Sequence, residues 1–490
     1  RRWDSLSDEE QELCARMMEV FAGFLEHTDA QIGKVLDYLE EIGELENTLV
    51  MVTSDNGASA EGGPTGSVDE NRFFNNVPES LEENLEAMDD LGGPEYFNHY
   101  PWGWTWAGNT PFRRWKRETY RGGASDPLVV SWPEGIEARG EVRDQFVHAI
   151  DLAPTIYEAV GIDPPEEVKG YSQSPIEGTS FAYSFDEPDA PEQHTTQYFE
   201  MLGTRAIYHD GWRAVHPWPF GEPMTAEALS ATTLEESGWE LYHVEEDFSE
   251  ARDVASEYPE KVLELAQLWW TEAGKHDVLP LDGRSVQRFA EARPEPGKPR
   301  EKYVYHPGGQ YAPENAAVKV FNRDHSITAD LTVPMGGAEG VLLAHGSRSG
   351  GYSLYVMDNR LKFVHNYVGV DEYDVVADEM LPEGDVSVRM EFEVTGDPDF
   401  SNGKGAPGTV RLFYDDTQVG EGEVPVTTPI TTGLTAGLSC GKDSVNTVTD
   451  AYREQTPFEF TGDITRVTVD VSGEPFVHEE AELDRIMARE

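Results

Sequence analysis

The sequence predicts an α/β domain followed by an all-β sandwich domain. Through residue 290, short apolar runs alternate with segments of helical period, which is typical of folds whose helices cover a sheet. Residues 291–310 combine prolines with charges, as linkers do. From 311 to 473 the apolar period switches to two, in short runs separated by turns, which predicts the sandwich. Residues 474–490 indicate an acidic tail.

The first elements of the predicted α/β domain are a long helix and a buried strand. Ser7 and Glu10 fit a capping box, and an apolar stripe of helical spacing then continues to Ile42, with Gly43 as its stop. We expect this stripe to pack against the sheet. Residues 49–53 are apolar and rich in β-branched side chains, which predicts a central strand of a parallel sheet, covered on both faces.

Further elements follow in the same alternating order. The α/β part continues with a strand at 127–132, a helix capped by Asp151 and ending at Gly161, a hairpin around His209-Asp210-Gly211, and a helix at 259–273 whose Leu263 and Trp269 point inward. The predicted sandwich strands are 327–333, 341–344, 352–357, 361–367, 386–394, 409–414 and 464–471.

Asp55 and Asn56 come directly after the first predicted strand. Ligands of open α/β sheets gather beyond the carboxyl ends of strands, and carboxylate and amide oxygens suit Ca²⁺ or Mg²⁺. The pair is therefore a candidate metal site. The alternative is an ordinary Asn-Gly hairpin turn at Asn56-Gly57.

The stretch 58–110 shows no strong period and predicts a long irregular loop with clustered aromatic residues, among them Trp102 and Trp104. We predict that these two tryptophans form the rim of a substrate pocket, and the alternative is a surface insertion. His99, like His148, has no metal-ligand spacing and is interpreted as an ordinary histidine.

A basic island occupies residues 113–121 of an otherwise acidic chain. Lys116 is the only lysine between Lys34 and Lys169, and a lysine ammonium is suited to holding a tetrahedral oxyanion. We predict a catalytic, substrate-binding role for Lys116 and a substrate contact for Arg113. A patch of ion pairs on the acidic surface is the alternative.

The formal charge of −56, from 93 acidic against 37 basic residues, argues against nucleic acid or an anionic membrane as a partner. Acidic residues spread over the whole chain are typical of halophilic proteins, whose self-repulsion salt screens. Two cysteines are too few for a disulfide framework. Neither a signal peptide nor a membrane span is evident, so the expected location is cytoplasmic.

Five motifs in order carry a family resemblance: residues 30–33 leading into 47–49, Ser54-Asp55-Asn56-Gly57, the segment 110–123, residues 198–203 leading into 205–207, and residues 239–242. Over residues 1–285 the chain resembles the C-terminal portion of the arylsulfatases of the alkaline phosphatase superfamily, and we expect a haloarchaeal source. The resemblance implies a sulfuric ester hydrolase with one Ca²⁺ (or Mg²⁺) per site and a formylglycine nucleophile. Asp55 and Asn56 match two metal ligands, and Lys116 matches the lysine that contacts the sulfate and the leaving oxygen. The remaining sandwich resembles the accessory, jelly-roll-like domain of long family members.

The chain departs from the family pattern at the nucleophile. The motif Cys-x-Pro-x-Arg is absent, since Cys14 is followed by Ala15-Arg16 and Cys440 by Gly441-Lys442. The family's first aspartate ligands normally precede the point where this sequence starts. We therefore expect a partial site, no turnover by this chain alone, and a separately encoded N-terminal half as a possible partner. The expected substrate is a sulfate-ester small molecule or a sulfated glycan.

Two other functions compete with this interpretation. A phosphatase or phosphodiesterase of the same superfamily has a similar metal site but usually brings histidine into it, and no histidine adjoins Asp55. A non-catalytic carbohydrate-binding protein built on the β-sandwich would leave Lys116 and the Asp-Asn-Gly motif without a role.

Overall fold

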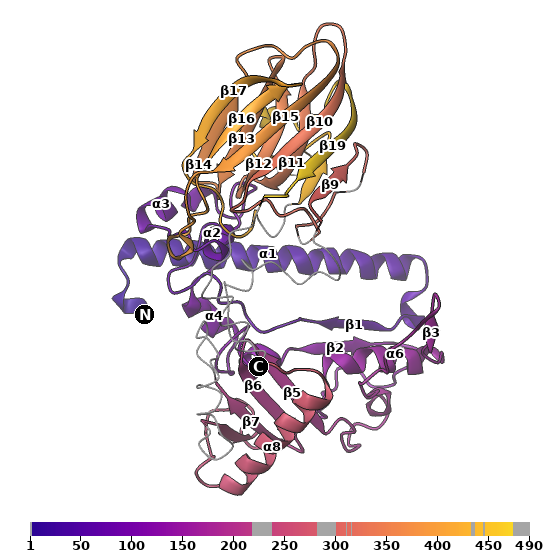
Figure 1. Cartoon of the computed structure of the whole chain (residues 1–490). Coiled ribbons are helices and arrows are strands. Elements are labelled where there is room, and N and C mark those ends of the chain that lie inside the picture. The colour runs from indigo at the N-terminus through magenta and orange to yellow at the C-terminus, as the bar shows by residue number, and fades with distance from the viewer. Residues whose placement is uncertain are drawn as a thin grey trace. The chain divides into compact units, whose positions relative to one another are not determined.

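The computed structural model describes residues 2–217, 238–281, 300–309, 311–314, 316–432, 437–443 and 446–473. The described chain divides into two compact units. Figure 1 shows the helices and strands of the whole chain. The first unit combines residues 2–22 and 61–102 with the described residues from 300 onward, and the second combines 23–60 with the described residues of 103–281. Residues 291–299 and 310 of the predicted linker, and the predicted tail at 474–490, lie outside the described residues.

Helix α1 (Asp8–Glu41) begins at the predicted capping box. The Ser7 amide donates to the Glu10 carboxylate at 2.8 Å, and the Glu10 amide donates to the Ser7 hydroxyl at 3.2 Å. The expected packing of the apolar stripe was wrong for much of its length, because Phe24 and Val35 are exposed while only Leu13, Cys14 and Met17 are buried. A helical period shows that one face is apolar but not which element covers it.

Strand β1 (Val50–Thr53) lies where the sequence predicts it, and so does β2 (Leu128–Ser131). The predicted parallel pairing and full burial were wrong. The two strands form a two-stranded antiparallel sheet with Thr53 opposite Leu128, and the side chain of Val129 is 61% exposed. An apolar run indicates that a strand has apolar faces, but it carries no information on the direction of its neighbour.

The main sheet of the second unit has four antiparallel strands in sequential order. They are β5 (Thr196–Met201), β6 (Thr204–His209), β7 (Trp212–His216) and β8 (Glu240–His243). Asp210 and Gly211, both at positive φ, make the predicted hairpin turn between β6 and β7. Helix α8 (Pro259–Lys275) buries Leu265 and Trp269 against this sheet, whereas Leu263 is exposed, contrary to expectation.

Helix α6 (Leu152–Val160) ends at Gly161 in the left-handed conformation, as predicted. Asp151 occupies the N-cap position of α6, as expected, but its side chain makes no cap bond to the helix. The buried carboxylate instead accepts hydrogen bonds from the amides of His148 (2.8 Å) and Thr179 (2.7 Å) and from Nδ1 of His194 (2.8 Å). Asp151 therefore joins three segments of the second unit.

The contact between Asp151 and His194 predicts a specific pH dependence of the protein's stability. Burial opposes both charges, but the contact with His194 and the two amides lowers the pKa of Asp151 below 3.8, and Asp151 raises the pKa of His194 above 6.5. The stability that His194 contributes to the folded protein is complete below pH 6.5. It is lost as the pH rises through the pKa that His194 has in the folded protein. The contribution of Asp151 is complete above pH 3.8 and is lost as the pH falls through its folded pKa. The contact between Asp151 and His194 thus stabilises the folded protein most between about pH 4 and 6.5.

His194→Gln is expected to remove the alkaline part of this dependence, because glutamine can still donate to Asp151 but does not titrate. Denaturant unfolding from pH 4 to 9 should show a wild-type advantage that shrinks above pH 6.5. His27→Gln, at an exposed position of α1, is the matched control. An unchanged pH profile in His194→Gln would contradict the assignment.

The C-terminal part of the first unit consists of a six-stranded and a five-stranded antiparallel sheet (Figure 1). Buried residues of both, such as Ile327 and Leu354, share one hydrophobic core. In order, the first sheet contains β17 (Thr417–Val424), β16 (Gly408–Tyr414), β15 (Gly384–Val394), β10 (His325–Val333), β19 (Asp463–Asp470) and β9 (Lys302–Tyr305). The second contains β14 (Asp371–Val376), β13 (Arg360–Tyr367), β12 (Gly350–Met357), β11 (Gly340–Ser347) and β18 (Leu438–Cys440).

Each of the seven predicted period-two runs coincides with a strand, but four of the strands that the structure describes in these two sheets were not predicted. Strand β9 lies inside the segment interpreted as a linker, so the linker prediction was wrong there. In the sequence, the prolines and charges that flank these four residues mask the alternation of Tyr303 and Tyr305. Strands β14 and β17 are acidic or glycine-rich, and β18 has three residues, so none carries a clear apolar period.

The stretch 58–110 is not the irregular loop that the sequence predicts. It contains α2 (Glu70–Phe74), α3 (Leu81–Glu86) and α4 (Trp102–Gly108), of which the first two begin at side-chain caps from Asp69 and Ser80. Helices of seven residues or fewer are too short to show a period. Other short elements are α5 (Arg121–Ala124), β3 (Glu167–Val168) and β4 (Tyr171–Ser172). Within the described residues, no helix has both the length and the apolar character that a membrane crossing requires.

Candidate functional site

The Asp-Asn-Gly motif forms the turn that leaves β1. The Ser54 hydroxyl donates to the carbonyl of Asn56 at 3.0 Å, and Asp55 is exposed while Asn56 is half-buried. A two-residue hairpin at Asn56-Gly57 is ruled out, because β1 pairs with β2, far along the chain, and not with the residues after the turn. The motif therefore presents its side chains at a strand end, as the metal-site interpretation requires.

Backbone hydrogen bonds join this turn to the basic segment. The Lys116 amide donates to the carbonyl of Ala58 at 3.1 Å, and the Gly57 amide donates to the carbonyl of Gly123 at 3.4 Å. The Ala58 amide donates to Oδ1 of Asn109 at 3.2 Å. The structure thus holds the backbone of Lys116 next to the residues that follow Asp55 and Asn56, although more than fifty residues separate them in sequence.

Glycines permit this close approach. A Cβ atom at Gly57 would lie 1.8 Å from the carbonyl oxygen of Gly122, so a larger residue cannot occupy the position without moving backbone. The same carbonyl accepts a hydrogen bond from Nδ2 of Asn109 at 2.6 Å, and Asn109 also donates to the carbonyl of Arg114 at 2.8 Å. Asn109 therefore ties both ends of the basic segment to the turn.

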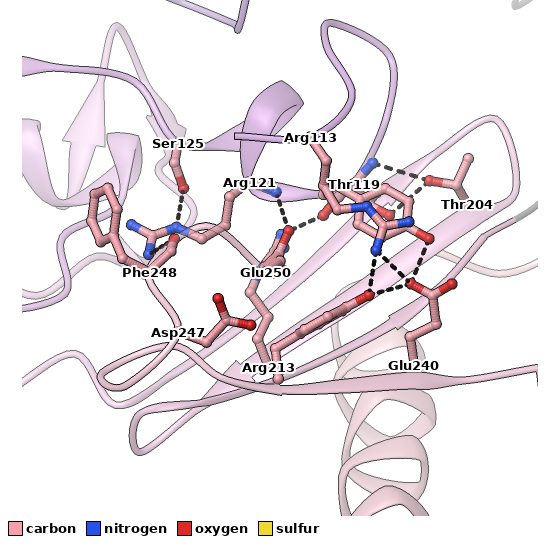
Figure 2. A network of polar contacts seen from close by, with 12 residues as sticks. Arg113, Thr119, Arg121, Ser125, Thr204, Arg213, Glu240, Asp247, Phe248 and Glu250 are labelled. Atoms are coloured by element: carbon pink, nitrogen blue, oxygen red, sulfur yellow. Dashed lines mark hydrogen bonds and ion pairs between the residues drawn. The ribbon is translucent and has the colours of Figure 1, made fainter. Parts of the chain in front are cut away.

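A buried ion pair anchors the segment to the four-stranded sheet (Figure 2). Arg213 of β7 and Glu250 are both buried and form a short ion pair. Arg213 also donates to the carbonyl of Thr119, and Glu250 accepts from the amide of Arg121 at 2.8 Å. Because each charged group satisfies the backbone of residues 119–121, the position of the basic segment depends on this pair.

Arg113 belongs to the same network. Its guanidinium donates to the Tyr242 hydroxyl at 2.8 Å, lies 3.6 Å from the carboxylate of Glu240, and stacks over the ring of Tyr120 with its Cζ 4.7 Å from the centroid (Figure 2). These contacts give Arg113 a structural role. The alternative of an ion-pair patch expects such a role for part of the basic island. Its substrate contact stays a prediction.

The region that carries Asp55, Asn56 and Lys116 is similar to a known protein family. Residues 2–162 match the family model of sulfatases. This range contains Asp55, Asn56 and Lys116. The chain is therefore similar to sulfatases across the segment that carries the site.

The matching curated relatives are sulfatases. An uncharacterized sulfatase of Schizosaccharomyces pombe is 30% identical over 272 residues, covering 55% of this chain and 45% of that protein. An arylsulfatase of Klebsiella aerogenes is 29% identical over 183 residues, or 37% of this chain and 38% of that protein. An N-acetylglucosamine-6-O-sulfatase of Bacteroides thetaiotaomicron is 24% identical over 49% of this chain and 32% of that protein. The chain spans less than half the length of each.

The oxygen atoms near the turn fit part of a site for a hard cation. They include those of Asp126, a carboxylate that was not predicted from the sequence. Asp126 precedes β2, whose first residue lies opposite the last residue of β1. Burial, and then the charge of Asp55, raise the pKa of Asp126 to about 6. The two carboxylates with Asn56 offer oxygens at one sheet end, whereas Ca²⁺ takes six to eight. Only the antiparallel pairing of β1 and β2 reveals Asp126.

The other predicted site residues are placed as follows. Lys116 and Trp104 are half-buried in the second unit, and Trp102 is exposed at the first residue of α4 in the first unit. Trp106, in α4, contacts Trp115 edge to face, with centroids 6.4 Å apart. The sulfate contact of Lys116 and the pocket-rim role of Trp102 and Trp104 stay predictions.

Proposed function

We propose that this chain contributes the Asp-Asn cation ligands and the sulfate-binding lysine to a metal-dependent sulfatase of the arylsulfatase type. The observation that carries the proposal is the hydrogen bond between the Lys116 amide and the Ala58 carbonyl, which brings the lysine segment to the turn of Asp55 and Asn56. The match of residues 2–162 to sulfatases supports it. The substrate is a sulfate ester, either a small molecule or a sulfated glycan.

Each residue has a definite task in this proposal. Asp55 and Asn56 hold a Ca²⁺ (or Mg²⁺) ion, and Asp126 adds negative charge beside them. When bound, the cation polarises a sulfate oxygen. The ammonium of Lys116 binds the sulfate and stabilises negative charge on the leaving oxygen. Arg213 and Glu250 act on the reaction only by positioning the segment that carries Lys116.

The nucleophile is not among these residues. The sequence lacks the Cys-x-Pro-x-Arg motif from which formylglycine forms, so we propose that the nucleophile comes from residues outside this sequence and that the chain alone does not turn over sulfate esters. The proposal also includes an accessory, jelly-roll-like role for the two C-terminal sheets and a haloarchaeal source for the acidic surface.

Binding measurements test the proposal without requiring turnover. Isothermal titration of the chain with Ca²⁺ should show a site whose affinity falls at least about tenfold in Asp55→Asn, because a charged ligand is lost. Asp37→Asn, at an exposed position of α1, is the matched control and should bind as the wild type does. Equal affinity in Asp55→Asn would refute the assignment of the metal.

Sulfate binding to the Ca²⁺-loaded chain tests Lys116 in the same experiment. Lys116→Ala should weaken the binding of inorganic sulfate about tenfold or more and leave Ca²⁺ affinity unchanged, whereas the exposed Lys34→Ala should change neither. Sulfate binding that is insensitive to Lys116 would remove this residue from the site.

A further inference from the structure

A second cluster of ligand-type side chains lies in the first unit. Glu61, Glu70 and His99 each place one ligand atom, a carboxylate oxygen or a ring nitrogen, so that all three atoms lie within 4.8 Å of one another. Glu61 and Glu70 are only 5% and 8% exposed, and His99 is half-buried. The histidine was interpreted as ordinary because these residues come from three separate stretches with no recognisable spacing.

Backbone pairing fixes the stretches of Glu70 and His99 against each other. Ser67 and His99 exchange two hydrogen bonds, of 2.9 and 2.8 Å, as an antiparallel bridge. Three residues after Ser67, the Glu70 amide donates to the carbonyl of Phe97 at 2.8 Å. Glu70 and His99 are therefore held in place by main-chain bonds that do not depend on their side chains, which is the preorganisation that a ligand set needs.

The tautomer of His99 is suited to coordination. Its Nδ1 lies 2.9 Å from the carbonyl oxygen of Tyr100, and because a carbonyl only accepts, Nδ1 carries the proton. In the neutral ring, the lone pair is then on Nε2. Metal-binding histidines characteristically donate their other ring N–H to a carbonyl or carboxylate in this way.

Gly62 allows the stretch with Glu61 to pass beside the imidazole. A Cβ atom at this position would lie 2.3 Å from the Tyr100 carbonyl oxygen and 2.9 Å from Nδ1 of His99. Any larger residue would push the Glu61 backbone away from the ring. The cluster thus depends on close backbone packing and not on flexible surface side chains.

Electrostatics favour a cation between these groups. Two buried carboxylates within 4.8 Å repel each other whenever both are ionised, and a divalent ion bound between them would relieve that repulsion. Two carboxylates with one neutral imidazole suit Zn²⁺, which commonly takes three protein ligands and leaves its fourth position open. We propose that Glu61, Glu70 and His99 bind one Zn²⁺ ion at a site separate from Asp55 and Asn56, and independent of the proposed sulfatase function.

Zn²⁺ titration of the full chain, in excess Mg²⁺ to saturate weak carboxylate sites, tests the proposal. The wild type should bind one ion that His99→Gln and Glu70→Gln each bind at least about 100-fold more weakly. His27→Gln and Glu82→Gln, both at exposed helix positions, should retain it. Asp55→Asn should retain it as well, and this result separates the site from the one proposed for sulfate hydrolysis. Unchanged affinity in His99→Gln would overturn the proposal.

Two further measurements keep the test decisive if a variant folds poorly. Co²⁺ bound to the wild type should give the visible d–d absorption of a low-coordinate site, and its absence would overturn the proposal. Anomalous scattering at the zinc edge from wild-type crystals should place the ion between Glu61, Glu70 and His99. A peak only elsewhere would contradict the assignment.

Discussion

Glu250→Gln is expected to lower the free energy of unfolding of the second unit by about 3–5 kcal/mol. The substitution keeps the shape of the side chain but leaves the buried Arg213 guanidinium without its counter-charge. It also weakens the acceptor of the Arg121 amide, and with it the link between the sheet and the basic segment. Denaturant unfolding, followed by the fluorescence of the tryptophans packed on the sheet, measures the loss.

Glu246→Gln is the control for this substitution. Its carboxylate is exposed and lies 3.8 Å from His243, an arrangement worth at most about 1 kcal/mol. If Glu250→Gln were as stable as Glu246→Gln, the buried pair would not anchor the segment, and the positioning of Lys116 would need another explanation.

Gly57→Ala is expected to disrupt the candidate site more than any other one-methyl change at the turn. The added Cβ would meet the Gly122 carbonyl oxygen at 1.8 Å, so the turn and the basic segment must separate. We expect a loss of about 3 kcal/mol or more, at the upper end of overpacking effects, together with weaker Ca²⁺ binding. Thermal unfolding and calcium titration of the same variant measure both.

Gly103→Ala provides the comparison within the second unit. This glycine lies in α4, and no atom is within 4 Å of the position that its Cβ would take. Alanine there should be neutral or stabilise by about 0.5–1 kcal/mol. Normal calcium binding and stability in Gly57→Ala would show that the turn and residues 122–123 are not in contact.

Several apolar residues of the second unit are exposed, although the sequence pattern predicts that they are buried. Val52 and Val129 on the β1–β2 sheet and Phe24 on α1 belong to patterns that predict burial, yet all three are exposed in the structure. A pattern records which face of an element is apolar, whereas burial also requires a second element at the right distance.

The sequence alone determined the elements whose signals are local. The capping box at Ser7, the turn at Asp210-Gly211 and the period-two runs of the two large sheets depend on neighbouring residues, and they lie where expected. The Asp-Asn-Gly motif and the isolated lysine were also visible, because both are short patterns of residue type.

Tertiary structure alone decided what brings distant residues together. The antiparallel pairing that places Asp126 beside Asp55, the backbone bond between Lys116 and Ala58, and the cluster of Glu61, Glu70 and His99 join stretches whose spacing has no recognisable rule. Such contacts arise from strand direction, glycine-permitted approach and buried charge pairing. These are properties of the packed chain, and no local sequence pattern encodes them.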